Sequence, residues 1–319
     1  MKTLKFNYVK FSIFVLIVVA IIVGIIIGII SMIKHVNYSK TYEYKLLEAG
    51  YTMDQVKLLD SKLNDKQKDY AIRRKYDEES VSLLSEKYFI YSKWEEYIDY
   101  KKKNKDVDNK KIVAIINSEA NIDWFDTEKE TDVSKGELML VNRLYGLSED
   151  YVPEDIVSVP IKYAFSGKKL SNVLLDKLIT MCDDAATDGY TFVVSEGYRT
   201  YKEQKNLYNN YANNNSKSEA DIYVARPGHS EYETGLSFDL EPYNKVIKNP
   251  LESEEYNWLK NNAYKYGFIF RFLSDKEDLT LFSADTWRLR YVGVDAATII
   301  YNDDLCFEEY YAYYVRGEK

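Results

Sequence analysis

The residue types with the clearest chemical potential lie between Arg226 and Leu240, in the stretch RPGHSEYETGLSFDL. It holds a histidine, several carboxylates and hydroxyls, and a glycine ahead of the apolar segment TGLSFDL. We interpret it as a candidate metal loop, in which Tyr232 would be a weak ligand. A phenol with a pKa of about 10 is a poor zinc ligand at neutral pH compared with imidazole.

Two further blocks carry polar residues at regular spacing. The first, SEGYRTYKEQ at 195–204, contains Arg199 and Gln204, and the second, ADTWRLRYVG at 284–293, contains Asp285 and Arg288. A fixed guanidinium can stabilise negative charge that develops on a carbonyl oxygen. It has no lone pair for a metal, so Arg288 cannot be a metal ligand.

Together these blocks resemble the VanY-type D-alanyl-D-alanine carboxypeptidases, zinc enzymes that trim peptidoglycan stem peptides. The loop is similar to the family pattern S-x-H-x-x-G-x-A-x-D, and the other two blocks to S-x-Y-R-S-x-x-x-Q and E-P-W-H-x-R-Y-V-G. A packing block, WLKNNAYKYGFIFR at 258–271, is similar to W-L-x-x-N-A-x-x-Y-G-F-I-x-R. The resemblance covers roughly residues 110–300 and implies an α+β fold, a small mixed or antiparallel sheet with flanking helices.

The resemblance also assigns roles to individual positions. Asp239 matches the carboxylate zinc ligand, whereas Tyr232 and Arg288 stand at the two histidine positions. Asp285 stands at the position of the catalytic glutamate, and Glu233 where the family usually has glutamine. Arg199 matches an arginine that faces the scissile carbonyl. Three further residues match substrate-binding positions: Gln204, Ser230 and Trp287.

One good ligand does not retain zinc, since the family site needs two imidazoles and a carboxylate. We therefore predict no cofactor, and hypothesise that Arg288 pairs with Asp239 in place of the metal. The leading interpretation is an inactive homologue that binds peptidoglycan stem peptide or a cell-wall protein. One alternative is an active carboxypeptidase whose metal site is rebuilt around Asp239 from other side chains, namely His229, Glu231, Glu233 or Asp285. Another alternative is a structural scaffold.

The order of expected elements agrees with an α+β domain. Residues 34–106 show helical spacing and predict a short helical stalk, with Thr52 as an N-cap, and the charged run 101–111 predicts a linker. KIVAIIN at 111–117 predicts a strand that opens a domain over 110–319. Helices are expected at 170–184, 202–212, 254–266 and from 294, and strands at 191–194, 236–240, 268–272 and 290–292.

The N-terminal segment is the membrane-like part of the chain. Residues 11–33 form a run of 23 residues without charge, long enough to span a hydrocarbon core of about 30 Å. We predict a single-pass anchor with a cytoplasmic tail over 1–10 and an extracytoplasmic C-terminal part. The alternative, a signal peptide, lacks a convincing cleavage site. Gly24 and Gly28 match the small-residue motif for weak helix pairing.

Charge excludes one class of partner. Residues 1–40 hold five of the 43 lysines and arginines and none of the 51 acids, which leaves a net charge of −13 on the rest of the chain. Such a chain is a poor nucleic-acid binder. Cys182 and Cys306 have no metal-type spacing, and two single buried thiols are expected rather than a bridge.

Overall fold

The computed structural model describes residues 7–74, 76–125, 127–243 and 245–317, in two compact units, Met1–Trp94 and Glu95–Lys319. The division lies before the charged run at 101–111, where the sequence predicts a linker. That run contains the end of one helix and the start of the next, so it is largely helical.

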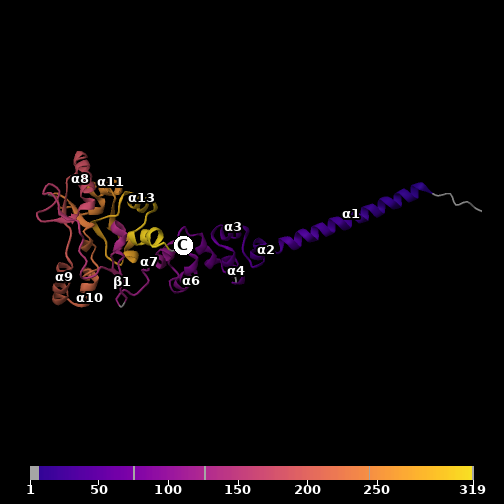
Figure 1. The fold of residues 1–319 in the computed structure, drawn as a ribbon, viewed down its shortest axis with the longest axis horizontal. Coiled ribbons are helices and arrows are strands. Elements are labelled where there is room, and N and C mark those ends of the chain that lie inside the picture. Colours follow the sequence, from indigo (N-terminus) through magenta and orange to yellow (C-terminus); the bar gives the residue numbers. More distant parts are fainter. Residues whose placement is uncertain (1–6, 75, 126, 244, 318–319) are drawn as a thin grey trace, which may run out of the picture. The chain divides into compact units, whose positions relative to one another are not determined.

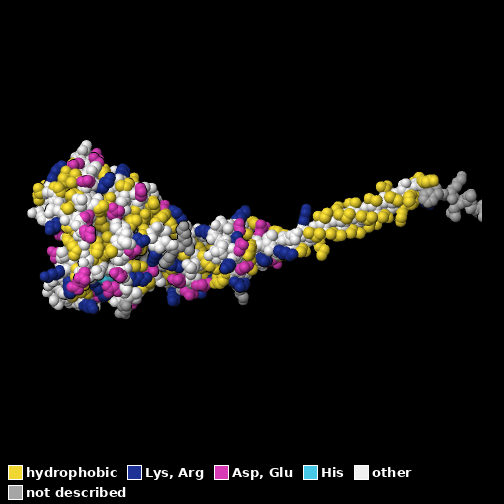
Figure 2. Space-filling model, in the orientation of Figure 1, with side chains coloured by type: hydrophobic (Ala, Val, Ile, Leu, Met, Phe, Trp, Pro, Cys, Tyr) yellow, Lys and Arg dark blue, Asp and Glu magenta, His cyan; other side chains and the backbone are white. Residues whose placement is uncertain are grey.

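The first unit begins with one long helix, α1, Tyr8–Tyr38. Its most apolar window has a mean hydropathy of 3.6, none of its residues is buried, and in the described chain it is the one helix long and apolar enough to cross a membrane. Figure 2 shows hydrophobic side chains along its length. The predicted apolar span is therefore a continuous helix, on which Gly24 and Gly28 lie one turn apart.

Short helices follow α1 within the same unit. They are α2 Tyr42–Glu48, α3 Met53–Lys62, α4 Asp65–Arg73 and α5 Glu78–Ser82. The side chain of Thr52 caps α3 and that of Asn64 caps α4, each with a glutamine that completes a capping box. Leu46, Leu59 and Leu83 are fully buried between these helices. The predicted helical region and the predicted cap at Thr52 are confirmed.

The second unit mixes helices with short strands. Its helices are α6 Trp94–Lys103, which begins at the boundary, α7 Asn109–Ser118, α8 Asn172–Thr187, α9 Tyr201–Asn214, α10 Lys217–Tyr223, α11 Glu254–Asn262, α12 Glu277–Thr280, α13 Val294–Asp303 and α14 Phe307–Tyr310. Its strands are β1 Lys129–Glu130, β2 Tyr145–Gly146, β3 Ile156–Ser158, β4 Lys169–Ser171, β5 Phe192–Glu196, β6 Ser237–Pro242, β7 Phe268–Phe272 and β8 Asp285–Tyr291. The predicted fold class is correct.

One predicted element is wrong. KIVAIIN is part of helix α7 and not a strand. Asp108 caps the helix by accepting a hydrogen bond from the backbone N–H of Lys111, and every residue from Ile112 to Ser118 is buried. A short apolar run that is buried on all sides shows no periodicity, so sequence alone does not distinguish helix from strand there.

A four-stranded antiparallel sheet organises the second unit, with the strand order β5-β6-β8-β7. In Figure 1, α8, α11 and α13 lie towards the top of the view and α9 and α10 towards the bottom. Phe238 and Leu289 are directly opposite each other on β6 and β8, and both belong to the core with Leu178 of α8. Because side chains alternate along a strand, their neighbours Asp239 and Arg288 project from the other face.

Candidate functional site

The loop before β6 is held in place by a glycine and a short 3₁₀ turn, Glu231–Thr234. Gly235 ends the turn with φ 70°, and a Cβ at this position would lie 2.5 Å from Ile156 Cδ1 and 3.2 Å from the backbone nitrogen of Ser171. Both the positive φ and the crowding require glycine. The loop can therefore turn sharply into β6 and bring Tyr232 over the sheet.

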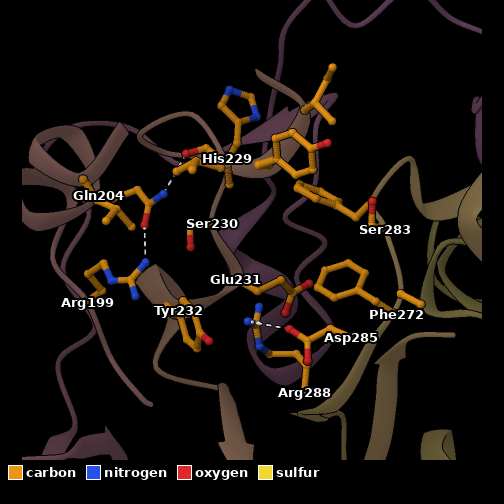
Figure 3. A pocket seen from close by; sticks show the side chains of 17 residues that line it. Arg199, Gln204, His229, Ser230, Glu231, Tyr232, Phe272, Ser283, Asp285 and Arg288 are labelled. Carbon is orange, nitrogen blue, oxygen red and sulfur yellow. Dashed lines mark hydrogen bonds and ion pairs between the residues drawn. The ribbon is translucent and has the colours of Figure 1, made fainter. Parts of the chain in front are cut away.

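Strand register brings the predicted metal ligand and its replacement together. Asp239 on β6 is the direct partner of Arg288 on β8. Arg288 Nε donates to Asp239 Oδ1, and Arg288 Nη2 donates to Asp285 Oδ2 at 2.9 Å. The hydroxyl of Tyr232 donates to the second oxygen, Asp239 Oδ2, at 2.8 Å. The hypothesis that Arg288 pairs with Asp239 is confirmed, and Figure 3 shows Arg288 and Asp285 joined at the floor of the cavity.

The phenol ring of Tyr232 also lies close to two cations. The Arg288 guanidinium carbon is 4.1 Å from the ring centre and that of Arg199 is 4.6 Å from it, distances at which a cation is attracted by the ring face. Burial raises the pKa of Tyr232, and the nearby Asp239 adds to this rise against the opposing effect of Arg288. The phenol therefore stays protonated and acts as a hydrogen-bond donor.

Charges at the floor keep Arg288 cationic. Burial alone would lower the pKa of Arg288, but Tyr232, Asp239 and Asp285 outweigh it and raise the pKa above its usual value. Burial raises the pKa of Asp285, and Asp239 adds to the rise, partly offset by Arg288. One guanidinium thus holds two carboxylates together where a metal cation would do so.

The residues at the predicted zinc position do not fit the metal. Both oxygens of Asp239 are engaged, Tyr232 is neutral, and the Arg288 guanidinium has no lone pair. Over the residues that the structure describes, no group of three or more His, Cys, Asp or Glu side chains could hold a metal ion.

The predicted alternative, a rebuilt metal site, draws on side chains that have other partners. His229 Nδ1 bonds the carbonyl of Asn142 at 2.8 Å, and Glu231 is bonded to Arg271 and Arg290. Glu233 accepts from the backbone N–H of Gly228 at 2.9 Å. The geometry therefore does not support this alternative.

Arg199 and Gln204 lie together at the wall of a cavity of about 360 Å³. Arg199 Nη1 donates to Gln204 Oε1 at 2.8 Å, and Gln204 Nε2 donates to the carbonyl of Ala225 at 2.7 Å (Figure 3). Ser230, Asp285 and Arg288 line the same cavity. The three sequence blocks therefore converge on one hollow.

Trp287 is the predicted substrate-binding residue that does not line this cavity. Its ring packs against the core and meets the ring of Tyr256 edge-on, with 6.3 Å between centroids. On β8, Trp287 immediately precedes Arg288, and alternation along the strand points the two side chains to opposite faces.

A cluster of buried ion pairs lies below the loop, and it was not predicted from the sequence. Arg271 Nε donates to Glu231 at 2.8 Å, Arg290 Nη1 donates to its other oxygen at 2.5 Å, and Arg271 also pairs with Glu308. All four side chains are almost completely buried. Burial raises the pKa of Glu231, but Arg290 and Arg271 outweigh it and lower the pKa overall. The arginines in the FIFR and RLRY blocks were the sequence signal for this cluster.

Comparisons with known proteins agree with this geometry. The family model VanY, D-alanyl-D-alanine carboxypeptidase, matches residues 167–294. YodJ of Bacillus subtilis is 36% identical over 54% of this chain and 66% of that protein. The D-alanyl-D-alanine carboxypeptidase of Enterococcus faecalis is 33% identical over 57% of this chain and 68% of that protein. The solved LdcB LD-carboxypeptidase, a structure that concerns peptidoglycan recognition, is 34% identical with a TM-score of 0.55, over 59% of this chain and 91% of that one.

These matches define a carboxypeptidase fold of the VanY type. The chain belongs to the VanY D-alanyl-D-alanine carboxypeptidase family. A solved vancomycin-resistance D,D-pentapeptidase VanY in complex with Zn(II) is 32% identical, with a TM-score of 0.47, over 55% of this chain and 98% of that one.

Proposed function

We propose that this protein is a membrane-anchored, extracytoplasmic binding domain for peptidoglycan stem peptides, and that it does not hydrolyse them. The observation that carries the proposal is the Arg288 guanidinium at the zinc position, bonded to Asp239 and Asp285. A family enzyme needs a metal-bound water and a carboxylate that takes its proton. Here the cation has no exchangeable coordination position, and Asp285 is held in an ion pair.

Binding is supported by the groups that remain in the cavity. Arg199 keeps N–H groups beyond the one that bonds Gln204, and Ser230 adds a hydroxyl to the lining. Leu207 and Ile222 contribute apolar surface to the same lining. A hollow that combines apolar side chains with several polar and charged groups suits a short peptide, and the solved structure of the relative LdcB concerns peptidoglycan recognition.

Membrane attachment is proposed from α1. Lys2, Lys5 and Lys10 precede the apolar run without an acid among them, which favours a cytoplasmic N-terminus and places the C-terminal unit outside. That side is where a stem-peptide ligand is found.

Metal analysis and peptide binding test the proposal on the full-length protein in nanodiscs. We expect substoichiometric zinc, no release of D-alanine from a stem pentapeptide, and saturable binding of that peptide by calorimetry. Arg199→Ala should weaken binding by about tenfold or more, since a hydrogen bond to a charged group contributes about 1.5–3 kcal/mol. The exposed Lys177→Ala serves as the matched control and should bind as the wild type.

Two results would contradict the proposal. Stoichiometric zinc with D-alanine release would identify an active carboxypeptidase. Absence of binding in both the wild type and Arg199→Ala would favour a structural scaffold.

A further inference from the structure

A second cavity continues from the first on the far side of Asp285. It measures about 350 Å³ and shares Phe272, Ala284 and Asp285 with the first cavity. No other wall residue is common to both, so the two hollows meet along this short boundary. The two cavities therefore adjoin each other at these three residues.

Aromatic side chains form much of the second cavity's wall. Tyr256, Phe270 and Phe272 all line it, and the rings of Tyr256 and Phe270 lie 4.9 Å apart at their centroids. Such a wall favours the methylene groups of an aliphatic side chain, because burial of apolar surface is favourable by about 25 cal/mol per Å².

The hydroxyl of Tyr256 is available to a ligand in this cavity. The residue is only 6% exposed, and its hydroxyl makes no hydrogen bond to any residue that the structure describes. A buried hydroxyl normally has a partner. The oxygen is nevertheless accessible, and the residue lines both this cavity and an adjoining one of about 120 Å³.

Asp275, an exposed residue, supplies a negative charge to the same wall. It lines the same cavity and forms no ion pair within the described chain. Burial raises the pKa of Tyr256, and the charge of Asp275 adds to the rise. The other charges of the wall are Asp285, paired with Arg288, Asp304, near Lys276 at 3.8 Å, and one cation, Lys260.

We infer that this second cavity, the Asp275 subsite, binds a primary ammonium group carried on an aliphatic side chain of the ligand. The methylene groups pack on Tyr256 and Phe270, and the ammonium donates to the Tyr256 hydroxyl and the Asp275 carboxylate. As a statement about the stem peptide, this inference rests on the proposed function. It narrows the ligand to peptides that contain a diamino acid whose side-chain amine is free.

Matched peptides test the subsite on the full-length protein in nanodiscs. Calorimetry compares a stem peptide that has a free ε-amine with the same peptide acetylated at that amine. In the wild type we expect acetylation to weaken binding about two- to fivefold, the range for a partly exposed ion pair. Asp275→Asn should abolish the difference between the two peptides, and Tyr256→Phe should reduce it. Asp176→Asn, an exposed aspartate on α8, should leave it unchanged.

A small probe separates failure of the subsite from failure of the proposed function. Saturation-transfer NMR measures contact with Nα-acetyl-lysine N-methylamide and with its Nε-acetyl analogue. A stronger signal for the free amine that disappears in Asp275→Asn supports the subsite even if no stem peptide binds. Equal signals for both probes, no signal at all, or a preference that persists in Asp275→Asn would overturn it.

Discussion

Arg288 provides, through a guanidinium, the positive charge that a metal cation would provide between two carboxylates. A planar guanidinium can donate to two carboxylates at fixed angles, as it does to Asp239 and Asp285, but it cannot bind and polarise water. Tyr232 completes the arrangement by donating to the remaining oxygen of Asp239. The site is thereby closed by side chains of the protein itself.

Removing this cation should destabilise the fold. Arg288→Met leaves Asp239 and Asp285 close together with little solvent, since the arginine side chain is only 16% exposed. We expect the free energy of unfolding to fall by about 3 kcal/mol, measured by denaturant titration with tryptophan fluorescence. Lys177→Met on the exposed face of α8 is the control and should change it by less than about 0.5 kcal/mol. An equally small change for Arg288→Met would show that the ion pair contributes nothing.

At the scale of elements, the loop and two strands position the side chains of the site. The antiparallel register of β6 and β8 sets Asp239 opposite Arg288, and the turn that ends at Gly235 sets Tyr232 above both. The buried pair of Arg271 and Arg290 holds Glu231, the residue next to Tyr232, from below. The loop is therefore fixed from both sides of the chain.

Gly235 should resist replacement. An alanine there combines a positive φ with a 2.5 Å contact to Ile156 Cδ1 and a 3.2 Å contact to the backbone nitrogen of Ser171, so we expect Gly235→Ala to cost about 3 kcal/mol. Gly189→Ala is a matched control, because it has φ 91° but nothing within 4 Å of the added carbon. Denaturant titration of both variants isolates the steric part, and equal losses would show that backbone strain alone matters.

Glu233 should make stability depend on pH. Burial raises its pKa to about 7 from 4.5, partly offset by the backbone N–H groups of Gly228 and Ser230. The folded state therefore binds an extra proton between these values, and the free energy of unfolding falls as the pH rises from 4.5 through 7. Glu233→Gln should be more stable than the wild type at pH 8 by about 1–3 kcal/mol.

Denaturant titrations at pH 5 and pH 8 check this expectation. The advantage of Glu233→Gln should shrink towards pH 5, where the wild-type carboxyl is protonated in the folded state. Glu252→Gln, at an exposed position, is the control. A wild type and Glu233→Gln with the same pH dependence would rule out the buried carboxyl as its source.

At the scale of the whole molecule, stability should not depend on a metal. Because Arg288 pairs with Asp239, the carboxylate predicted to be a zinc ligand, we expect excess EDTA to shift the melting temperature of the full-length protein by less than about 1 °C, whereas loss of a structural metal removes its binding free energy from folding. Differential scanning fluorimetry with and without EDTA, and after added zinc, makes the measurement. A clear loss of stability in EDTA would mean that a metal is bound.

Sequence reasoning found much of the fold and most of the site residues for identifiable reasons. Strands such as Phe268–Phe272 and the helix from Val294 were predictable because apolar periodicity and bounding glycines mark them. Helix α7 was missed because a run buried on all sides has no polar face. Arg199 and Gln204 were found through motif spacing, but spacing does not reveal that they bond each other.

By itself, the sequence determined the family, the apolar N-terminal span and the identities of the groups at the zinc position. Those follow from local residue types, which cannot change with the fold: an arginine has no lone pair anywhere in a structure. Only the tertiary structure decided that Arg288 joins Asp239 to Asp285, that Glu231 lies in a buried cluster with two arginines, and that a second cavity adjoins the first. Each depends on strand register and packing between segments far apart in the chain, where distance, and not residue type, sets the interaction.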